Sequence, residues 1–321
     1  MRHCSRVLAA LVLSSLGVSA AAQEFPNRPM RIIIPFPPGG TTDILGRIVG
    51  ERMNQAWKVP VLSDNRAGAG GVVGVEAAAK APPDGYTMLV YTIAMTTWPV
   101  IHKQLSFDAV RDFVPLSNLT LIPSLLVMHP SVPARTVKEL VALMKARPGQ
   151  LNYATTGAGT SPHLFMEMFR AATGTSVVHV PYKGGAPAMV DLMAGQVEMG
   201  FTTVLPVVPF VKDKKLIALA VSTKQRFPIL PDVPTMHESG VRDFDASSWV
   251  GMVAPRGTPP DIAVKLSTEI RRILDQPEIR ERLLGLGGIP AGSTSEEFGK
   301  FIQNEATKWQ KVAIDAKLKA E

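Results

Sequence analysis

Two glycine-rich segments of the chain have the residue types to bind an anion through backbone amides. They are Pro35-Phe36-Pro37-Pro38-Gly39-Gly40-Thr41-Thr42-Asp43 and Thr155-Thr156-Gly157-Ala158-Gly159-Thr160-Ser161-Pro162. Each follows an apolar run typical of a buried strand and precedes a periodic pattern typical of a helix. Such a joint directs unpaired N–H groups and the positive end of a helix dipole at one point. We therefore expect a small-anion site, while an ordinary turn that needs glycine for its geometry remains the alternative.

The polar side chains of the first segment have several possible roles. Thr41, Thr42 and Asp43 are predicted to supply N-cap oxygens, and the threonine hydroxyls are also candidate donors to a ligand. Asp43 is a candidate partner of Arg47 four residues later, or an acceptor for an amine on the ligand.

In the second segment, Ser161 suits an N-cap and Pro162 the first helical position. His163 follows them near the start of the predicted helix, where the helix dipole disfavours the charged ring. A neutral donor to the ligand and a structural hydrogen bond are both open for this histidine.

Strand-like runs alternate with helical patterns almost throughout, which predicts an α/β fold with largely parallel sheets. Two proline-punctuated stretches, 107–129 and Pro228–Pro234, are predicted to cross between two lobes. Thr92, Ala94 and Thr203 follow the ends of predicted strands, where open α/β sheets bind their ligands.

Sequence motifs of catalysis, metal binding and cofactor binding are missing. His237-Glu238 lacks the second histidine of a zinc motif because residue 241 is valine. There is no G-x-S-x-G motif or phosphate-binding loop, and Gly68 and Gly70 do not complete a dinucleotide fingerprint because residue 73 is valine. We therefore expect no catalytic residue, no metal ligand and no cofactor.

The N-terminus reads as a secretory signal peptide over residues 1–22. A short positive start precedes the apolar run Val7–Val18, and Ala20-Ala21-Ala22 fits a cleavage site. The rest of the chain is long enough for two domains and has no later apolar stretch of membrane-spanning length. The net charge of +7 is scattered and lacks interleaved aromatic residues, so we expect no nucleic-acid partner.

Several motifs, in order along the chain, resemble one family. They are Pro35–Asp43, Asp64-Asn65-Arg66-Ala67-Gly68-Ala69-Gly70-Gly71, Pro83-Asp84-Gly85-Tyr86-Thr87, Leu151–Leu164, Val180-Pro181-Tyr182-Lys183-Gly184-Gly185, Asp232-Val233-Pro234-Thr235 and Trp249-Val250-Gly251. In these features the chain resembles the Bug (Bordetella uptake gene) proteins, periplasmic receptors of tripartite tricarboxylate transporters. The resemblance covers essentially the whole chain after residue 22.

The resemblance implies a two-lobed periplasmic binding protein of type II, a Venus flytrap with two crossing segments. Lobe one would comprise residues 23–124 and 225–321, and lobe two residues 125–224. A ligand carboxylate would lie between the two glycine-rich loops, partly through water. The ligand-binding residues predicted from the loops and the strand ends are Pro38, Gly39, Gly40, Thr41, Thr42, Asp43, Thr92, Ala94, Thr155, Gly157, Gly159, Thr160, His163 and Thr203.

The function implied is that of a monomeric periplasmic receptor that binds a small carboxylate and delivers it to membrane permease subunits. Two alternatives stay open. One is a periplasmic enzyme acting on a small organic acid, and the other is a ligand-sensing adaptor for a membrane sensor kinase. The sequence does not name the solute.

Overall fold

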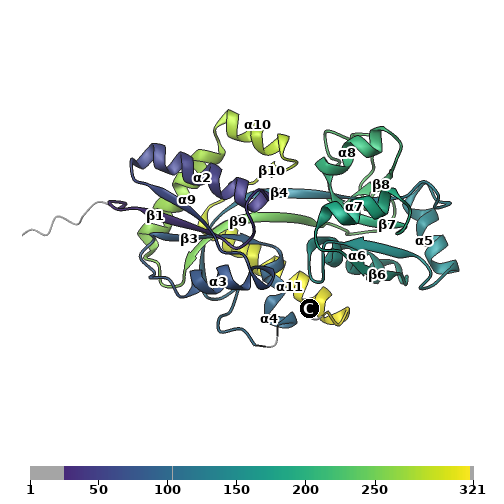
Figure 1. The fold of residues 1–321 in the computed structure, drawn as a ribbon, viewed down its shortest axis with the longest axis horizontal. Coiled ribbons are helices and arrows are strands. Elements are labelled where there is room, and N and C mark those ends of the chain that lie inside the picture. The colour runs from purple at the N-terminus through teal and green to yellow at the C-terminus, as the bar shows by residue number, and fades with distance from the viewer. Residues whose placement is uncertain (1–24, 103, 319–321) are drawn as a thin grey trace, which may run out of the picture.

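The computed structural model describes residues 25–102 and 104–318, which form an elongated molecule of two halves (Figure 1). The predicted signal peptide lies outside the described residues. The first half contains β1 (Met30–Ile34), α2 (Thr41–Trp57), β2 (Val61–Asn65), the short 3-10 helix η1 (Ala69–Gly71), α3 (Val72–Ala79), β3 (Thr87–Thr92) and α4 (Ala94–Ile101).

The chain then enters the second half along the long strand β4 (Phe113–Met128). The second half contains α5 (Val137–Ala146), β5 (Asn152–Thr155), α6 (Ser161–Thr173), β6 (Val178–Pro181), α7 (Gly185–Met193), β7 (Met199–Thr203), α8 (Val204–Lys212) and β8 (Ile217–Val221). The return strand and the elements after it are β9 (Ser247–Pro255), α9 (Pro260–Leu274), α10 (Pro277–Gly285), β10 (Ile289–Pro290) and α11 (Ser295–Asp315).

The described strands form one continuous sheet in the order β2-β1-β3-β9-β4-β7-β5-β6, with β8 and β10 also pairing to β4. Strands β1, β2 and β3 are parallel to each other, as are β5, β6 and β7. Every pairing that involves β4 or β9 is antiparallel. The sheet is therefore mixed, and the prediction of largely parallel sheets is wrong at its centre. The reason is that β4 runs outward and β9 runs back through the middle of the sheet.

Strand β4 belongs to both halves. Its residues Phe113–Pro123 pair with β9, and Ser124–Met128 pair with β7. The stretch 107–129, predicted as a crossing, thus contains one uninterrupted strand. Pro115 lies at a shift in the register with β9, a place where a residue without an N–H is tolerated.

The return crossing lies later than predicted. The segment Pro228–Pro234 stays with the second half, because the Val221 N–H donates to the Pro234 carbonyl and Val233 packs against the apolar cluster of that half. The chain crosses back after Ala246, whose N–H donates to Ser222, and β9 starts at Ser247.

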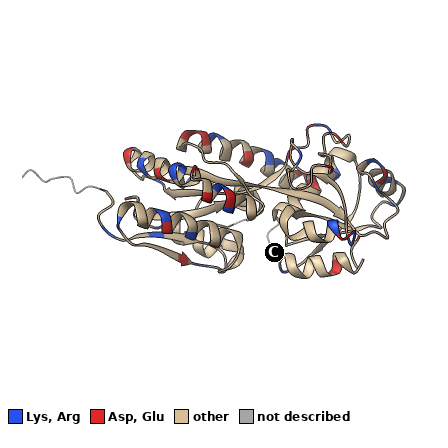
Figure 2. Ribbon diagram, turned by 90° about the horizontal axis from the view of Figure 1, so that it is seen from above, with Lys and Arg blue, Asp and Glu red and all other residues tan. Residues whose placement is uncertain are grey.

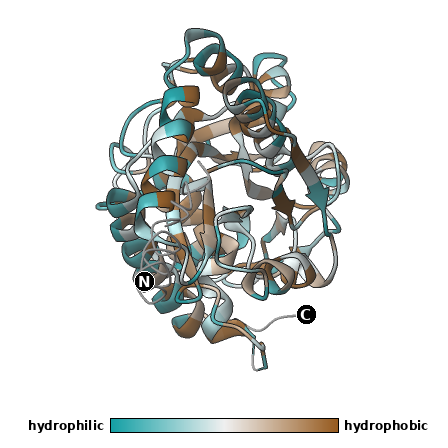
Figure 3. Ribbon diagram, turned by 90° about the vertical axis from the view of Figure 1, so that its left-hand side faces the viewer, coloured by the Kyte–Doolittle hydropathy of each residue, from teal (hydrophilic) through white to brown (hydrophobic). Residues whose placement is uncertain are grey.

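The apolar core continues from one half into the other. In Figure 3 the central strands are largely brown, and the helices around them alternate between teal and brown. Helix α11 joins the halves, because Trp309 packs against Phe165 of α6 with ring centroids 5.3 Å apart. The indole N–H groups of Trp249 and Trp309 both donate to the buried Glu305, at 2.9 and 2.7 Å.

Charged residues of both signs are interspersed over the helices of both halves (Figure 2). Among the described residues, no helix has the length and apolar character needed to cross a membrane.

Candidate functional site

The strand ends of the two halves point toward each other. Thr92, at the end of β3, pairs with Val250, which also pairs with Thr120 of β4. Thr203, at the end of β7, pairs with Ser124 of the same strand. Thr120 and Ser124 are four positions apart on β4, so about 13 Å of strand separates the end of β3 from the end of β7, at a rise of about 3.3 Å per residue.

Because β1 and β2 run with β3, and β5 and β6 run with β7, the carboxyl ends of all six strands face this short interval. The helices that follow β1, β3, β5, β6 and β7 begin there as well; these are α2, α4, α6, α7 and α8. The arrangement places the starts of helices from both halves around one space, the position where open α/β sheets bind ligands.

The first glycine-rich loop presents backbone rather than capping side chains. Helix α2 starts at Thr41 with Gly40 as its N-cap residue, and no described side chain caps it. The prediction that Thr41, Thr42 and Asp43 cap this helix is wrong, because the N-cap position falls on a residue without a side chain. Pro38, Gly39, Gly40 and Thr41 are exposed, so the first-turn amides of α2 are open to a ligand.

Asp43 holds this loop from inside. Its side chain is 6% exposed and accepts hydrogen bonds from the Gly39 N–H, from Arg47 Nε and from Asn65 Nδ2, at 3.0, 2.9 and 2.9 Å. The hydrogen bond from Arg47 is the main cause that lowers the pKa of Asp43 to about 2; burial opposes it, and the other two donors assist. The predicted pairing with Arg47 is present, and the carboxylate is engaged by protein donors.

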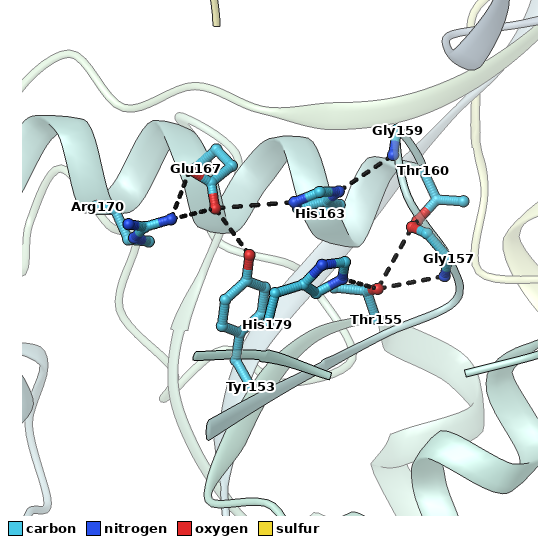
Figure 4. A network of polar contacts seen from close by, with 9 residues as sticks. All are labelled: Tyr153, Thr155, Gly157, Gly159, Thr160, His163, Glu167, Arg170 and His179. Carbon is cyan, nitrogen blue, oxygen red and sulfur yellow. Dashed lines mark hydrogen bonds and ion pairs between the residues drawn. The ribbon is translucent and has the colours of Figure 1, made fainter. Parts of the chain in front are cut away.

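The second glycine-rich loop is held by its own hydroxyls (Figure 4). Thr155 Oγ1 accepts from the Gly157 N–H at 3.2 Å and lies 2.7 Å from His179 Nε2. Thr160 Oγ1 donates to the Gly157 carbonyl at 2.7 Å. Helix α6 therefore starts at Ser161 with Thr160 as N-cap, one residue before the predicted cap. No described side chain caps it, because the Thr160 hydroxyl is turned to the loop.

His163 holds the second glycine-rich loop through a hydrogen bond to its backbone. Its Nδ1 accepts from the Gly159 N–H at 3.1 Å, and its ring stacks on His179 with centroids 3.9 Å apart. Desolvation by burial is the main cause that lowers the pKa of His163 to about 4; the neighbouring His179 adds to it, and Glu167 opposes it. The side chain is 7% exposed, and of the two open roles this structure displays the structural hydrogen bond.

A buried carboxylate completes the network in Figure 4. Glu167 accepts from the Tyr153 hydroxyl at 2.7 Å and from Arg170 Nη1 at 2.6 Å. Its Oε1 lies 3.8 Å from His163 Nε2. The second glycine-rich loop is thus connected through His163 to the ion pair of Glu167 and Arg170.

A cavity of about 410 Å³ opens in the second half beside this loop. It lies at the ends of β5 and β7, among the starts of α6, α7 and α8. Its lining consists of Ala154, Thr155, Thr156, Ser161, Pro162, Gly185, Ala186, Ala188, Met189, Leu192, Gly200, Phe201, Thr202, Thr203, Pro206 and Phe210.

The predicted ligand-binding residues lie at different places in the structure. Thr155 and Thr203 line this cavity. Gly157, Gly159, Thr160 and His163 belong to the loop network beside it, whereas Pro38–Asp43 lie in the other half. The side chain of Thr92 is buried, and its hydroxyl has no hydrogen-bond partner among the described residues. Ala94 is the first residue of α4.

Sequence reasoning missed the walls that α7 and α8 contribute to the cavity. Met189, Leu192 and Phe210 occur in apolar helical patterns that look like ordinary core. Gly185 at the start of α7 was a usable signal, because it follows a strand end as the two glycine-rich loops do. Within the described residues, no group of three or more histidine, cysteine, aspartate or glutamate side chains is placed to hold a metal ion.

The fold is the two-lobed α/β fold of periplasmic binding proteins, shared with solved structures of similar chains. This confirms the predicted fold class. Residues 45–318 match the model of the tripartite tricarboxylate transporter family receptor, and the chain belongs to that family. The predicted resemblance to the Bug proteins is confirmed by the protein BugT of Bordetella pertussis, which is 35% identical over 325 residues covering 99% of this chain and 100% of BugT.

Two solved structures of similar chains carry bound acids. Rpa4515 of R. palustris with adipate is 32% identical, with a TM-score of 0.80, over 92% of this chain and 99% of that chain. MatC of Rhodopseudomonas palustris with malate is 30% identical, with a TM-score of 0.76, over 90% of this chain and 99% of that chain. The chain is therefore a receptor-type solute-binding protein, similar to proteins that bind carboxylates.

Proposed function

We propose that this protein binds a small carboxylate between its lobes and delivers it to the permease subunits of a tripartite tricarboxylate transporter. The observation that carries the proposal is the pair of uncapped helix starts, α2 in one lobe and α6 in the other, at facing strand ends. Their free amides and dipoles favour an anion without a neutralising arginine. The acids bound by Rpa4515 and MatC support the same chemistry.

The proposal includes the lobes and the compartment. Lobe one comprises residues 23–124 and 247–321, and lobe two residues 125–246; the boundary predicted at residue 225 moves to 247 because residues 225–246 pack with lobe two. The protein would be exported by the signal peptide 1–22 and work in the periplasm as a monomer. All fourteen predicted ligand-binding residues belong to this proposed site, with Asp43 and His163 as supports of the loops.

Two other functions make different predictions. A periplasmic enzyme acting on a small acid would convert the bound compound, so unchanged acid after prolonged incubation argues against it. An adaptor for a sensor kinase would bind the same acid and differ in its membrane partner. Co-purification from membrane extracts, with and without acid, separates a permease from a kinase.

The sharpest test of the anion site is Gly40→Val. Gly40 has an extended backbone (φ −80°, ψ 169°), and a side chain there would meet nothing closer than the Pro37 carbonyl at 3.9 Å, so the variant should fold. Its β-branched side chain would nevertheless obstruct a ligand approaching the amides of α2. We expect the affinity for any bound carboxylate to fall at least tenfold in calorimetric titration.

The matched control is Gly285→Val, at a position in α10 where a Cβ meets nothing within 4 Å. It should bind as the wild type does. A folded Gly40→Val protein with wild-type affinity would refute the assignment of the first loop. The ligand panel for finding the acid is a thermal-shift screen, since a ligand at 100 times its dissociation constant adds about 2.7 kcal/mol of stability.

A further inference from the structure

The cavity of lobe two has an uncharged lining. None of its sixteen residues is an aspartate, glutamate, lysine, arginine or histidine. Lys183, which precedes α7, is exposed and does not line the cavity. A carboxylate inside this cavity would therefore depend on backbone amides at the starts of α6, α7 and α8, and away from these helix starts it would meet only neutral side chains.

The inner surface is mainly apolar. Lobe two contributes Met189 and Leu192 from α7, Phe210 from α8 and Phe201 from β7. Met189 and Phe210 are partly exposed, whereas Phe201 and Leu192 are buried. These side chains would contact the body of a ligand by apolar packing, which strengthens with each buried methylene group.

The polar groups of the lining are neutral. The Thr155 hydroxyl is engaged by Gly157 and His179, as Figure 4 shows. Thr156, Ser161, Thr202 and Thr203 provide hydroxyls that suit a polar group on the ligand, such as a hydroxyl or a ketone.

The cavity is large for the smallest acids. A volume of about 410 Å³ lies within the range of about 300–1,000 Å³ for small-molecule sites. At about 30 Å³ per water it corresponds to about fourteen waters, so acetate would leave most of it filled with water. A longer body would displace that water.

We propose that the solute is a monocarboxylate with an uncharged, largely apolar body, which occupies this cavity while its carboxylate faces the glycine-rich loops. This inference rests on the proposed function and narrows it. It predicts weak binding of diacids such as adipate, because a carboxylate at the far end of the ligand would meet the apolar side chains of Met189, Leu192 and Phe210.

The test compares six-carbon and four-carbon acids by isothermal titration calorimetry on the mature protein. The probes are hexanoate, butanoate, adipate and hexanamide. We expect hexanoate to bind about 15-fold more tightly than butanoate, at about fourfold per methylene group. Adipate should bind at least tenfold more weakly than hexanoate, and hexanamide should not bind.

Each contrary result shows whether the apolar-body inference alone or the proposed function as well is wrong. Adipate binding as tightly as hexanoate would overturn the apolar-body inference and leave the carboxylate receptor intact. Equal binding of butanoate and hexanoate would also overturn it. Hexanamide binding as well as hexanoate, or no acid binding at all, would overturn the proposed function together with the inference.

Two variants test whether the ligand body occupies this cavity. Met189→Lys puts a cation into the cavity, and we expect it to weaken hexanoate at least tenfold and to tighten adipate. Val190→Lys is the matched control, because the next residue of α7 is 58% exposed and does not line the cavity. Thermal melts report whether both variants fold. An unchanged hexanoate-to-adipate ratio in folded Met189→Lys protein would place the ligand body elsewhere and overturn the inference.

Discussion

At the scale of single residues, the site depends on side chains that shape the loops from behind. Asp43 fixes the first loop through the Gly39 amide, and His163 fixes the second through the Gly159 amide. Both are buried; the charge state of Asp43 follows mainly from its hydrogen bond with Arg47, and that of His163 mainly from burial. Stability measurements at different pH values can therefore test both roles.

Asp43→Asn should cost stability in a pH-dependent way. The pKa of Asp43 is lowered from 3.8 to about 2, so the folded state favours the carboxylate. Its contribution, about 2 kcal/mol, is complete above pH 4 and is lost as the pH falls toward 2. In urea unfolding, the variant should be less stable than the wild type at pH 7 and nearly equal to it at pH 2.

Asp315→Asn is the matched control, since Asp315 also forms an i,i+4 pair, with Lys311, but is exposed. It should change the free energy of unfolding by less than about 1 kcal/mol. An equal deficit of Asp43→Asn at pH 7 and pH 2 would show that the carboxylate charge is not the stabilising feature.

His163→Asn should flatten the dependence of stability on pH between 6.5 and 4. The folded pKa of about 4 lies below the usual 6.5, so the unfolded chain binds the proton first and stability falls as the pH drops through this window. Asparagine offers an acceptor to the Gly159 amide and does not titrate. The groups that face the ring, His179, Glu167, Arg170 and Tyr153, remain in place.

The control is His237→Asn, because His237 Nδ1 also accepts a backbone N–H, from Asp243, but is exposed. We expect that variant to keep the wild-type slope. A wild-type slope in His163→Asn as well would assign the acid sensitivity to other groups. The readout is the urea midpoint measured at half-unit steps of pH.

At the scale of elements, what the sequence predicts well is what is decided locally. The capping box of Thr294 and Glu297 is present in both of its hydrogen bonds. The pattern Thr136-x-x-Glu139, which also predicts a capping box, gives only half of one, because Thr136 accepts from the Glu139 N–H while the Glu139 carboxylate accepts from the Arg135 N–H. Helix caps depend on short-range contacts, so these predictions differ from the structure by one residue or one hydrogen bond.

Features that depend on long-range packing could not be predicted from the sequence. The segment Pro228–Pro234 has the proline content of a crossing, but the preceding Phe227 is buried in the apolar cluster of the second half and the partly buried Val233 packs against that cluster. The apolar pattern of α7 and α8 does not tell core from cavity wall. Strand direction at the sheet centre also depends on which strands become neighbours, and one sequence does not contain that information.

The close approach of β9 to α11 can be tested with the variant Gly251→Ala. Gly251 of β9 lies directly against the ring of Phe298 on α11, and a Cβ at this position would collide with that ring. We expect a loss of about 1–3 kcal/mol in the free energy of unfolding, the usual cost of overpacking a core.

The added variant Phe298→Leu makes room and should recover part of the loss in the double variant, which a double-mutant cycle measures. Gly285→Ala is the control, since a methyl group there meets nothing within 4 Å. A neutral Gly251→Ala would mean that α11 can move away from β9 at little cost, contrary to the tight docking that we describe.

At the scale of the whole molecule, the two lobes are joined by the strands β4 and β9 and by the packing of α11. The lobes also meet at two peripheral points: Gly159 lies close to Ile101 of α4, and Gly287 lies close to Leu205 of α8. A solute held between the strand ends would contact both lobes. It would favour the more closed arrangement to the extent that it binds that arrangement more tightly.

Ligand should therefore compact the protein in small-angle X-ray scattering. The comparison uses the mature protein with saturating hexanoate or adipate, whichever titrates, and the same acid with Gly40→Val. We expect a smaller radius of gyration for the wild type with acid and no change for the variant, because the variant cannot engage lobe one. If the acid binds the wild type with an unchanged scattering profile, the ligand is held by one lobe, and closure is not part of its recognition. Compaction of the Gly40→Val protein to the same extent would instead assign closure to contacts outside the first loop.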